Sequence, residues 1–80
     1  MRAGFYCTVQ RLVQRDGVMS ARTGWLLGPY DDEPTARAML PDARRLAYEA
    51  DHRTHFDAFG TARLEQAGDL PQGIFNDRLA

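Results

Sequence analysis

The sequence predicts a small two-layer α+β domain, in which a three-stranded antiparallel sheet packs on a proline-kinked helix. Three observations predict this fold. A strand-turn-strand pattern covers residues 4–27, apolar residues recur with helical period over 33–51, and a further strand pattern covers 55–65. The expected order is β-β-α-β, with a short last helix as an option, in a single domain spanning residues 1–80.

The first two strands are expected to form a hairpin. Residues 4–15 and 18–27 are rich in β-branched and aromatic side chains, which suit the pleated surface of a sheet. The dipeptide Asp16-Gly17 separates them and favours a type I′ turn, because both central residues of that turn need positive φ. These residues predict a hairpin with a two-residue turn.

A two-residue turn fixes which residues of the hairpin face each other. It pairs Cys7 with Leu26 and Tyr6 with Leu27, so that both faces of the ribbon carry apolar side chains. An antiparallel sheet with one face in water would alternate more cleanly. Either a bulge shifts the register or a second surface of the hairpin is covered, and the sequence leaves both explanations open.

The helix is expected over residues 33–51. The acids at 31–33 lie where the positive end of a helix dipole favours negative charge. Pro41 removes a backbone hydrogen bond from the helix interior, so we expect either a bent helix or two short helices that meet near Leu40. The apolar face consists of Ala36, Met39, Leu40, Ala43, Leu46, Ala47 and Ala50.

The third strand and the C-terminal segment complete the expected fold. In residues 55–65, alternate positions share a face, and a turn follows at 66–69. Residues 70–79 are expected to form a short helix or an ordered tail. The side chains expected to pack from this segment are Ile74, Phe75 and Leu79.

Charge excludes two classes of protein. The 80 residues hold ten arginines, no lysine and eleven acids, a net charge of −1. A general nucleic-acid binder would be clearly basic, and a protein that imitates DNA would be strongly acidic. The charge is nevertheless unevenly distributed, because residues 1–30 have four arginines against one aspartate (+3), whereas residues 31–80 have six arginines against ten acids (−4).

Apolar run lengths and side-chain chemistry argue against a membrane span, an enzyme and a metal protein. The longest apolar run is three residues, far below the roughly 20 that a membrane-spanning helix needs. No catalytic triad and no glycine-rich phosphate loop is visible. His52 and His55 straddle the expected end of the helix and start of the strand, so they are not expected to share a metal. We therefore expect no catalytic residue, no cofactor and no metal.

Cys7 has two open explanations. As the single cysteine it rules out an intrachain disulfide and a cysteine-based zinc cluster. In a strand it is expected to be a small, buried apolar residue. The alternative is a position at the interface of a homodimer, where it would form an intermolecular disulfide.

Three arginines lie on the expected hairpin. The two-residue turn places Arg11 opposite Arg22, and like charges that face each other in a sheet are unfavourable. Either the register differs, or acids or a ligand offset the repulsion. Together with Arg15, these residues form a basic ribbon, in which the long arginines either cover exposed strand faces or bind phosphate or an acidic protein.

The whole chain resembles the small phage-encoded anti-CRISPR proteins, in particular inhibitors of type I-C systems, most distinctively in the stretch FYCTVQRLVQRDG at residues 5–17. The resemblance implies non-enzymatic binding to a CRISPR surveillance complex, which blocks its access to target DNA, in the cytoplasm of the host bacterium. These inhibitors share no diagnostic motif, so the resemblance assigns no functional residue.

The leading hypothesis is therefore a protein-binding inhibitor of a CRISPR surveillance complex. Two alternatives remain: a nucleic-acid-binding accessory domain that uses the basic hairpin, and a domain that mainly oligomerises. Tyrosine, tryptophan and arginine dominate binding hot spots. The residues expected to contact the partner are Tyr6, Arg11, Arg15, Arg22 and Trp25.

Overall fold

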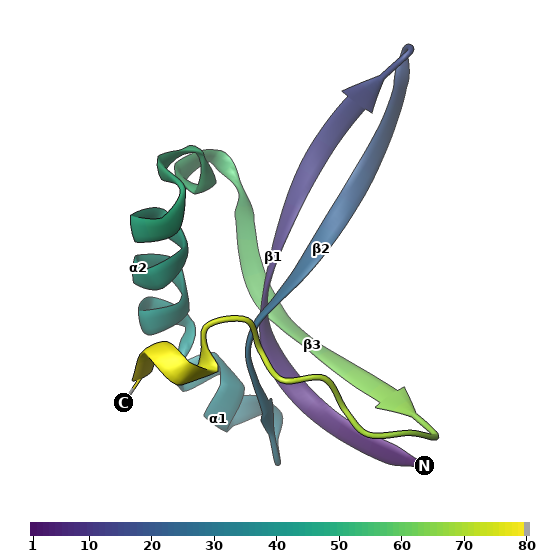
Figure 1. Ribbon diagram of the computed structural model, residues 1–80, viewed down its shortest axis with the longest axis vertical. Helices are drawn as coiled ribbons and strands as arrows, with labels where there is room; N and C mark the ends of the chain where they lie inside the picture. The colour runs from purple at the N-terminus through teal and green to yellow at the C-terminus, as the bar shows by residue number, and fades with distance from the viewer. Residues whose placement is uncertain (80) are drawn as a thin grey trace.

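The computed structural model describes residues 1–79, apart from the side chain of His55. It contains a three-stranded antiparallel sheet and two α-helices, which confirms the α+β class (Figure 1). The elements in chain order are β1 (Arg2–Arg15), β2 (Val18–Tyr30), α1 (Glu33–Ala38), α2 (Leu40–Ala50), the 3-10 helix η1 (His52–Phe56), β3 (Ala58–Gln66) and the 3-10 helix η2 (Asn76–Leu79).

The central strand of the sheet is β1, with β2 on one side and β3 on the other. β1 has 14 residues and β2 has 13, whereas β3 has only nine. Pairing between β1 and β3 runs from Arg2 opposite Gln66 to Gln10 opposite Ala58 and stops there. The distal third of the hairpin therefore extends past the end of β3 as a two-stranded ribbon.

The turn and the distal register match the expectation. Asp16 and Gly17 both have positive φ, 51° and 80°, as a type I′ turn requires. Arg15 lies opposite Val18, and the register holds as far as Thr8 opposite Trp25.

Nearer the termini the predicted register is wrong, because β2 has one extra residue at each of two bulges. Cys7 lies opposite Leu27 rather than Leu26, and the partner of Phe5 is Tyr30. The bulge opposite Thr8 and Cys7 brings Leu26 and Leu27, which are neighbours in sequence, into one buried cluster with Cys7.

The helices cover one face of the sheet, which we call the helix-side face. The expected helical segment is divided into α1 and α2, with Met39 between them and Pro41 in the first turn of α2. Asp32 caps α1 by accepting a hydrogen bond of 2.8 Å from the Thr35 N–H. The buried cluster between these layers consists of Cys7, Leu26, Leu27, Ala43, Leu46 and Ala47.

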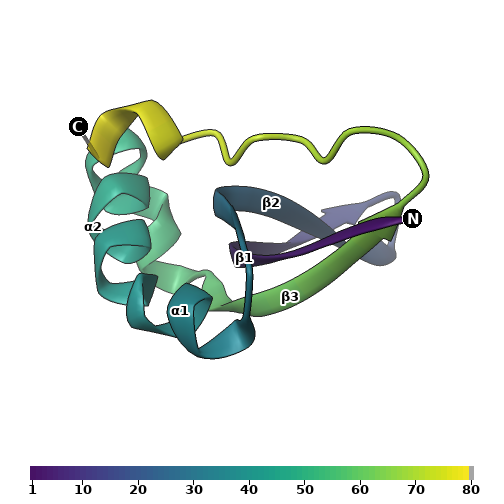
Figure 2. The same cartoon turned by 90° about the horizontal axis from the view of Figure 1, so that it is seen from below.

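The C-terminal segment covers the opposite face of the sheet and the exposed edge of β2 (Figure 2). The N–H groups of Gly73, Ile74 and Phe75 donate to carbonyls of β2 at 2.9–3.0 Å. A Cβ on Gly73 would lie 2.6 Å from the backbone of Leu27, so only glycine fits at this contact. Asn76 extends the attachment, since its side chain hydrogen-bonds both the N–H and the carbonyl of Gly28. Both explanations left open by the sequence, a bulge and a second covered surface, are therefore present.

The third strand begins later than expected. Residues 52–56 form η1 instead of the start of a strand, because the Asp51 side chain caps this turn by accepting from the Arg53 N–H at 3.0 Å. The expected terminal helix is reduced to the single 3-10 turn η2.

Candidate functional site

Residues 11–22 form the part of the molecule that is least covered, and we call this segment the arm. It comprises the end of β1, the turn and the start of β2, and it projects away from the helices (Figure 1). All other described residues form the body. The longest dimension of the molecule is 37 Å, along which the arm extends.

Apolar side chains are exposed along the whole arm. Leu12 is 71% exposed, Val18 66% and Met19 56%. Burying one side chain of this size contributes about 1.5–3 kcal/mol, yet nothing in the described chain covers these three. Several exposed apolar side chains in one short segment are typical of an interaction surface.

The two faces of the arm differ in chemistry. The pairing of β1 with β2 places alternate residues together on each face. The helix-side face carries Arg11, Val13, Arg15, Val18, Ser20 and Arg22, and the opposite face carries Leu12, Gln14, Met19 and Ala21. One face is therefore basic and the other is uncharged.

Arg11 anchors the base of the arm to the body. Its guanidinium donates to both carboxylate oxygens of Asp57, at 2.8–3.1 Å, and lies 3.5 Å from Asp51. The hydrogen bonds to Asp57 raise the pKa of Arg11, and the nearby charge of Asp51 acts in the same direction. Asp51 in turn binds Arg53, whose hydrogen bonds hold the pKa of Asp51 well below its ordinary value. This network is a charge-assisted joint between β1, η1 and the start of β3.

The joint explains how two arginines can face each other and changes the role expected for Arg11. Arg11 does lie opposite Arg22, and the acids at 51 and 57 offset the repulsion. Because Arg11 is already paired, it positions the arm rather than offering a free cation. Arg15 and Arg22 are exposed on the same face of the arm, so these two carry its available positive charge.

The expected contact residues Tyr6 and Trp25 lie in the body instead. Tyr6 is completely buried, and its hydroxyl donates to the Pro71 carbonyl at 2.6 Å. Trp25 is half-buried and packs edge-on against the Tyr6 ring, with centroids 5.0 Å apart. The C-terminal segment covers the face on which both rings lie, so Tyr6 is corrected from a contact residue to a core residue.

Cys7 is likewise a core residue and lies outside any exposed surface of the monomer. Its side chain is 0% exposed, and its thiol donates to the Ala36 carbonyl at 2.9 Å. Burial, reinforced by the charge of Asp42, raises the pKa of the thiol to about 11. An intermolecular disulfide through Cys7 would require the helix layer to open, so the structure supports the expectation of a small buried apolar residue rather than the dimer interface.

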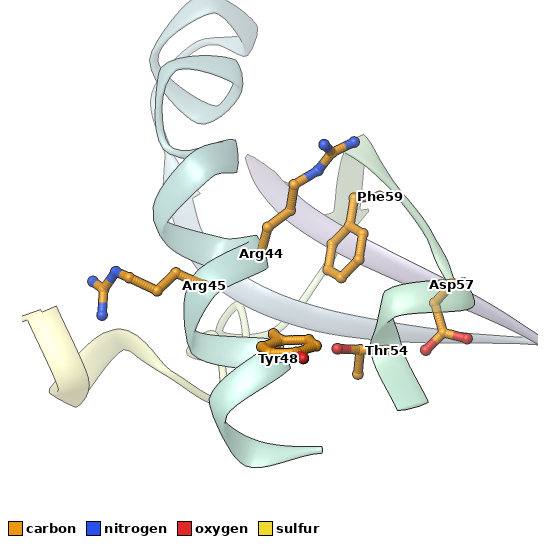
Figure 3. Close-up of a pocket in the computed structure, with 6 residues that line it drawn as sticks. All are labelled: Arg44, Arg45, Tyr48, Thr54, Asp57 and Phe59. Atoms are coloured by element: carbon orange, nitrogen blue, oxygen red, sulfur yellow. The ribbon is translucent and has the colours of Figure 1, made fainter. Parts of the chain in front are cut away.

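A pocket of about 440 Å³ lies between α2, η1 and β3 (Figure 3). The Thr54 hydroxyl is buried there, has no hydrogen-bond partner among the described residues, and is directed toward Tyr48. The Arg44 guanidinium covers the Phe59 ring at 5.5 Å, while Arg45 points away from the pocket. Its polar groups therefore do not converge on one point, as a small-ligand site requires.

The described residues hold no group of three or more histidine, cysteine or acidic side chains arranged for a metal ion. The His52 ring stacks on Tyr48 at 4.7 Å, and the side chain of His55, the other expected member of the pair, lies outside the described residues. Within the described chain, no helix has the length and apolar character needed to cross a membrane.

Comparisons with protein-family models, with curated proteins and with solved structures found no match for the chain.

Three residues of the arm escaped the sequence-based reasoning: Leu12, Val18 and Met19. Aromatic residues and arginines were predicted as contact residues instead, because they dominate known binding hot spots. Strand length gave no signal, because the strand expected over residues 55–65 is nearly as long as the one expected over 4–15, and only the structure shows that β3 is too short to pair with the whole of β1.

Proposed function

We propose that this protein is a non-enzymatic binding protein whose arm contacts a protein partner, and that the partner is a type I CRISPR surveillance complex whose binding to target DNA it blocks. The body serves as the rigid support of the arm. The observation that carries the proposal is the projecting ribbon, which exposes apolar side chains on both faces and free arginines on one of them.

The composition of the arm supports a protein partner. A typical interface has an apolar centre with arginine and aromatic residues, surrounded by a polar rim. Leu12 and Met19 supply adjacent apolar area on one face, and Arg15 and Arg22 supply charge on the other. The choice of a CRISPR complex rests on the resemblance of residues 5–17 to anti-CRISPR proteins.

Nucleic-acid binding is the second candidate function, favoured by one observation. Arg15 and Arg22 are exposed on one face of a ribbon, and a two-stranded ribbon fits the major groove of DNA. Two arginines provide few phosphate contacts, so binding to free DNA should be weak and steeply salt-dependent.

The test is target-DNA binding by a purified type I-C surveillance complex, measured with and without this protein, beside a lane of free DNA. Loss of target binding, with no shift of the free DNA at about 50 mM salt, is the expected result. A shift of the free DNA would favour the second candidate. A complex that binds its target unchanged would contradict the proposal.

A matched pair of variants assigns the effect to the arm. Leu12→Ser removes an exposed apolar side chain from the arm, and Ile74→Ser removes one, 64% exposed, from the body. Truncating a hot-spot side chain costs about 2 kcal/mol or more, roughly thirtyfold in affinity. We expect Leu12→Ser to weaken inhibition by that factor and Ile74→Ser to leave it unchanged.

A further inference from the structure

The edge of β1 in the arm is open on the side where β3 ends. On that side, no strand among the described residues pairs with β1 beyond Gln10, whereas β2 stays paired on the other side as far as Arg15. Arg15 and Val18 flank the two-residue turn and form a hydrogen-bonded pair. Because such pairs alternate along an antiparallel ladder, Leu12 and Gln14 direct their N–H and carbonyl groups away from β2, toward the open edge.

A groove lies at the point where β3 leaves β1. Its volume is about 600 Å³, and residues from both sides of the edge form it. Leu12 and Phe56, which are 71% and 89% exposed, supply its apolar wall. The lining consists of Gln10, Arg11, Leu12, Arg53, Phe56, Asp57 and Ala58. The groove is thus continuous with the open edge and follows the line on which a further strand would run.

We propose that this edge binds an extended segment of the partner protein as an added antiparallel strand, with apolar and acidic residues alternating along the segment. The proposal rests on the function proposed above and specifies its binding mode. Strand addition gives affinity through backbone hydrogen bonds and specificity through alternate side chains.

The chemistry of the segment follows from the two faces of the arm. Alternate side chains of an added strand point to opposite faces of the sheet. Those on the uncharged face would lie beside Leu12, which lines the groove together with Phe56, and should be apolar. Those on the helix-side face would lie beside Arg15 and should be acidic, because this cation is exposed there.

Amide exchange tests the proposal with a synthetic probe. The probe is a capped heptapeptide that alternates glutamate and valine, added to the uniformly labelled full-length protein and followed by NMR. At about nine times the dissociation constant, only a tenth of the protein is free, so the amides of Leu12 and Gln14 should exchange about tenfold more slowly. The amides of Met19 and Ala21, which face the other edge of the arm, should not change.

Two control peptides separate charge from strand formation. A peptide with lysine in place of glutamate should bind more weakly, because it places cations beside Arg15. A peptide that carries N-methyl groups on its valine amides should not slow exchange, because it cannot complete the ladder. Binding by the N-methylated peptide as strong as that of the parent would overturn strand addition.

A pair of proline variants tests the same mode with the surveillance complex. Proline is tolerated in a strand where its missing N–H would face an open edge. Gln14→Pro removes a donor from the proposed edge, and Ala21→Pro removes one from the opposite edge of the arm. We expect the first to weaken inhibition at least tenfold and the second to preserve it, with circular dichroism verifying the fold of both.

The remaining outcomes each overturn the proposal in a distinct way. Slowed exchange at Met19 and Ala21 would show that the peptide binds the edge of β2 and not the open edge of β1. Slowing at Leu12 and Gln14 that grows with protein concentration, without peptide, would assign the edge to a second copy of the chain. Failure of the peptide to bind, while Leu12→Ser still abolishes inhibition, would refute strand addition and leave the proposed function intact.

Discussion

The two ends of the same hairpin, one in the body and one in the arm, have different surroundings. In the body, β1 and β2 lie between the helices on one face and the C-terminal segment on the other, and Tyr6, Cys7 and Leu27 are completely buried. In the arm, the same two strands have water on both faces, and Leu12 and Val18 are mostly exposed. The local sequence is β-forming throughout, so the difference comes from what packs on the strands.

Body and arm therefore contribute differently to the stability of the fold and to the binding of a partner. Side chains of the body are held by packing and therefore determine the free energy of unfolding. Side chains of the arm have few contacts, and changes to them should affect a partner more than the fold. The joint of Arg11 with Asp57 lies at the boundary, where it fixes the direction in which the arm projects.

The largest expected contrast between the two regions is in thiol reactivity. At pH 8, a thiol with a pKa of about 11 is ionised in only about one molecule in a thousand, and the thiolate is the reactive form. Cys7 should therefore react with a disulfide reagent at least about a hundredfold more slowly than a cysteine introduced in the arm by Ser20→Cys. A stopped-flow measurement should show one fast and one slow thiol, and both should become fast in denaturant.

The next contrast is in packing. Leu27→Ala should destabilise the protein by about 2–5 kcal/mol, because it leaves a cavity in the core. Leu12→Ala in the arm should change the free energy of unfolding by less than about 0.5 kcal/mol. Chemical denaturation measures both, and equal losses for the two variants would show that the arm is packed against something in solution.

A smaller loss is expected where the C-terminal segment meets β2. Gly73→Ala forces a methyl group against the backbone of Leu27, at a cost of about 1–3 kcal/mol. Gly68→Ala is the control, because a Cβ there meets nothing within 4 Å. A segment attached as described should also expose Tyr6 in the Gly73 variant, which near-UV circular dichroism detects.

The smallest effect concerns the joint at the base of the arm. The pKa of Asp51 is lowered by Arg53 and Arg11, so its contribution to stability is complete above the unfolded value of about 3.9. It is lost as the pH falls through the lower pKa of the folded state. Between pH 7 and about 4, the Asp51→Asn variant should differ from the parent by a constant amount. Below that range the difference should shrink, as denaturant unfolding at each pH can establish.

Local residues made the hairpin and the fold class predictable. The positive φ angles of Asp16 and Gly17 specify the hairpin turn, and the turn fixes the pairing of β1 with β2 from Arg15 as far as Thr8. The predicted register fails beyond Thr8 because of tertiary packing. The bulges in β2 place Leu26 and Leu27 in the buried core, although strict alternation along the strand would put them on opposite faces.

The site was harder to predict than the fold because exposure depends on distant parts of the chain. Tyr6 is buried by Pro71, 65 residues away, and no local pattern around Tyr6 reveals this. The facing pair of Arg11 and Arg22 left open a different register, an offset by acids or an offset by a ligand, and the acids that supply the offset depend on how η1 folds.

The most direct test of the division between arm and body compares two charge reversals of equal size. Arg15→Glu with Arg22→Glu alters the arm, and Arg2→Glu with Arg78→Glu alters exposed positions of the body. Affinity for the type I-C surveillance complex is measured for both, beside their unfolding free energies. We expect at least a hundredfold loss of affinity for the arm pair, near-unchanged affinity for the body pair, and similar unfolding free energies for the two. Equal affinity for both variants would contradict the assignment of binding to the arm.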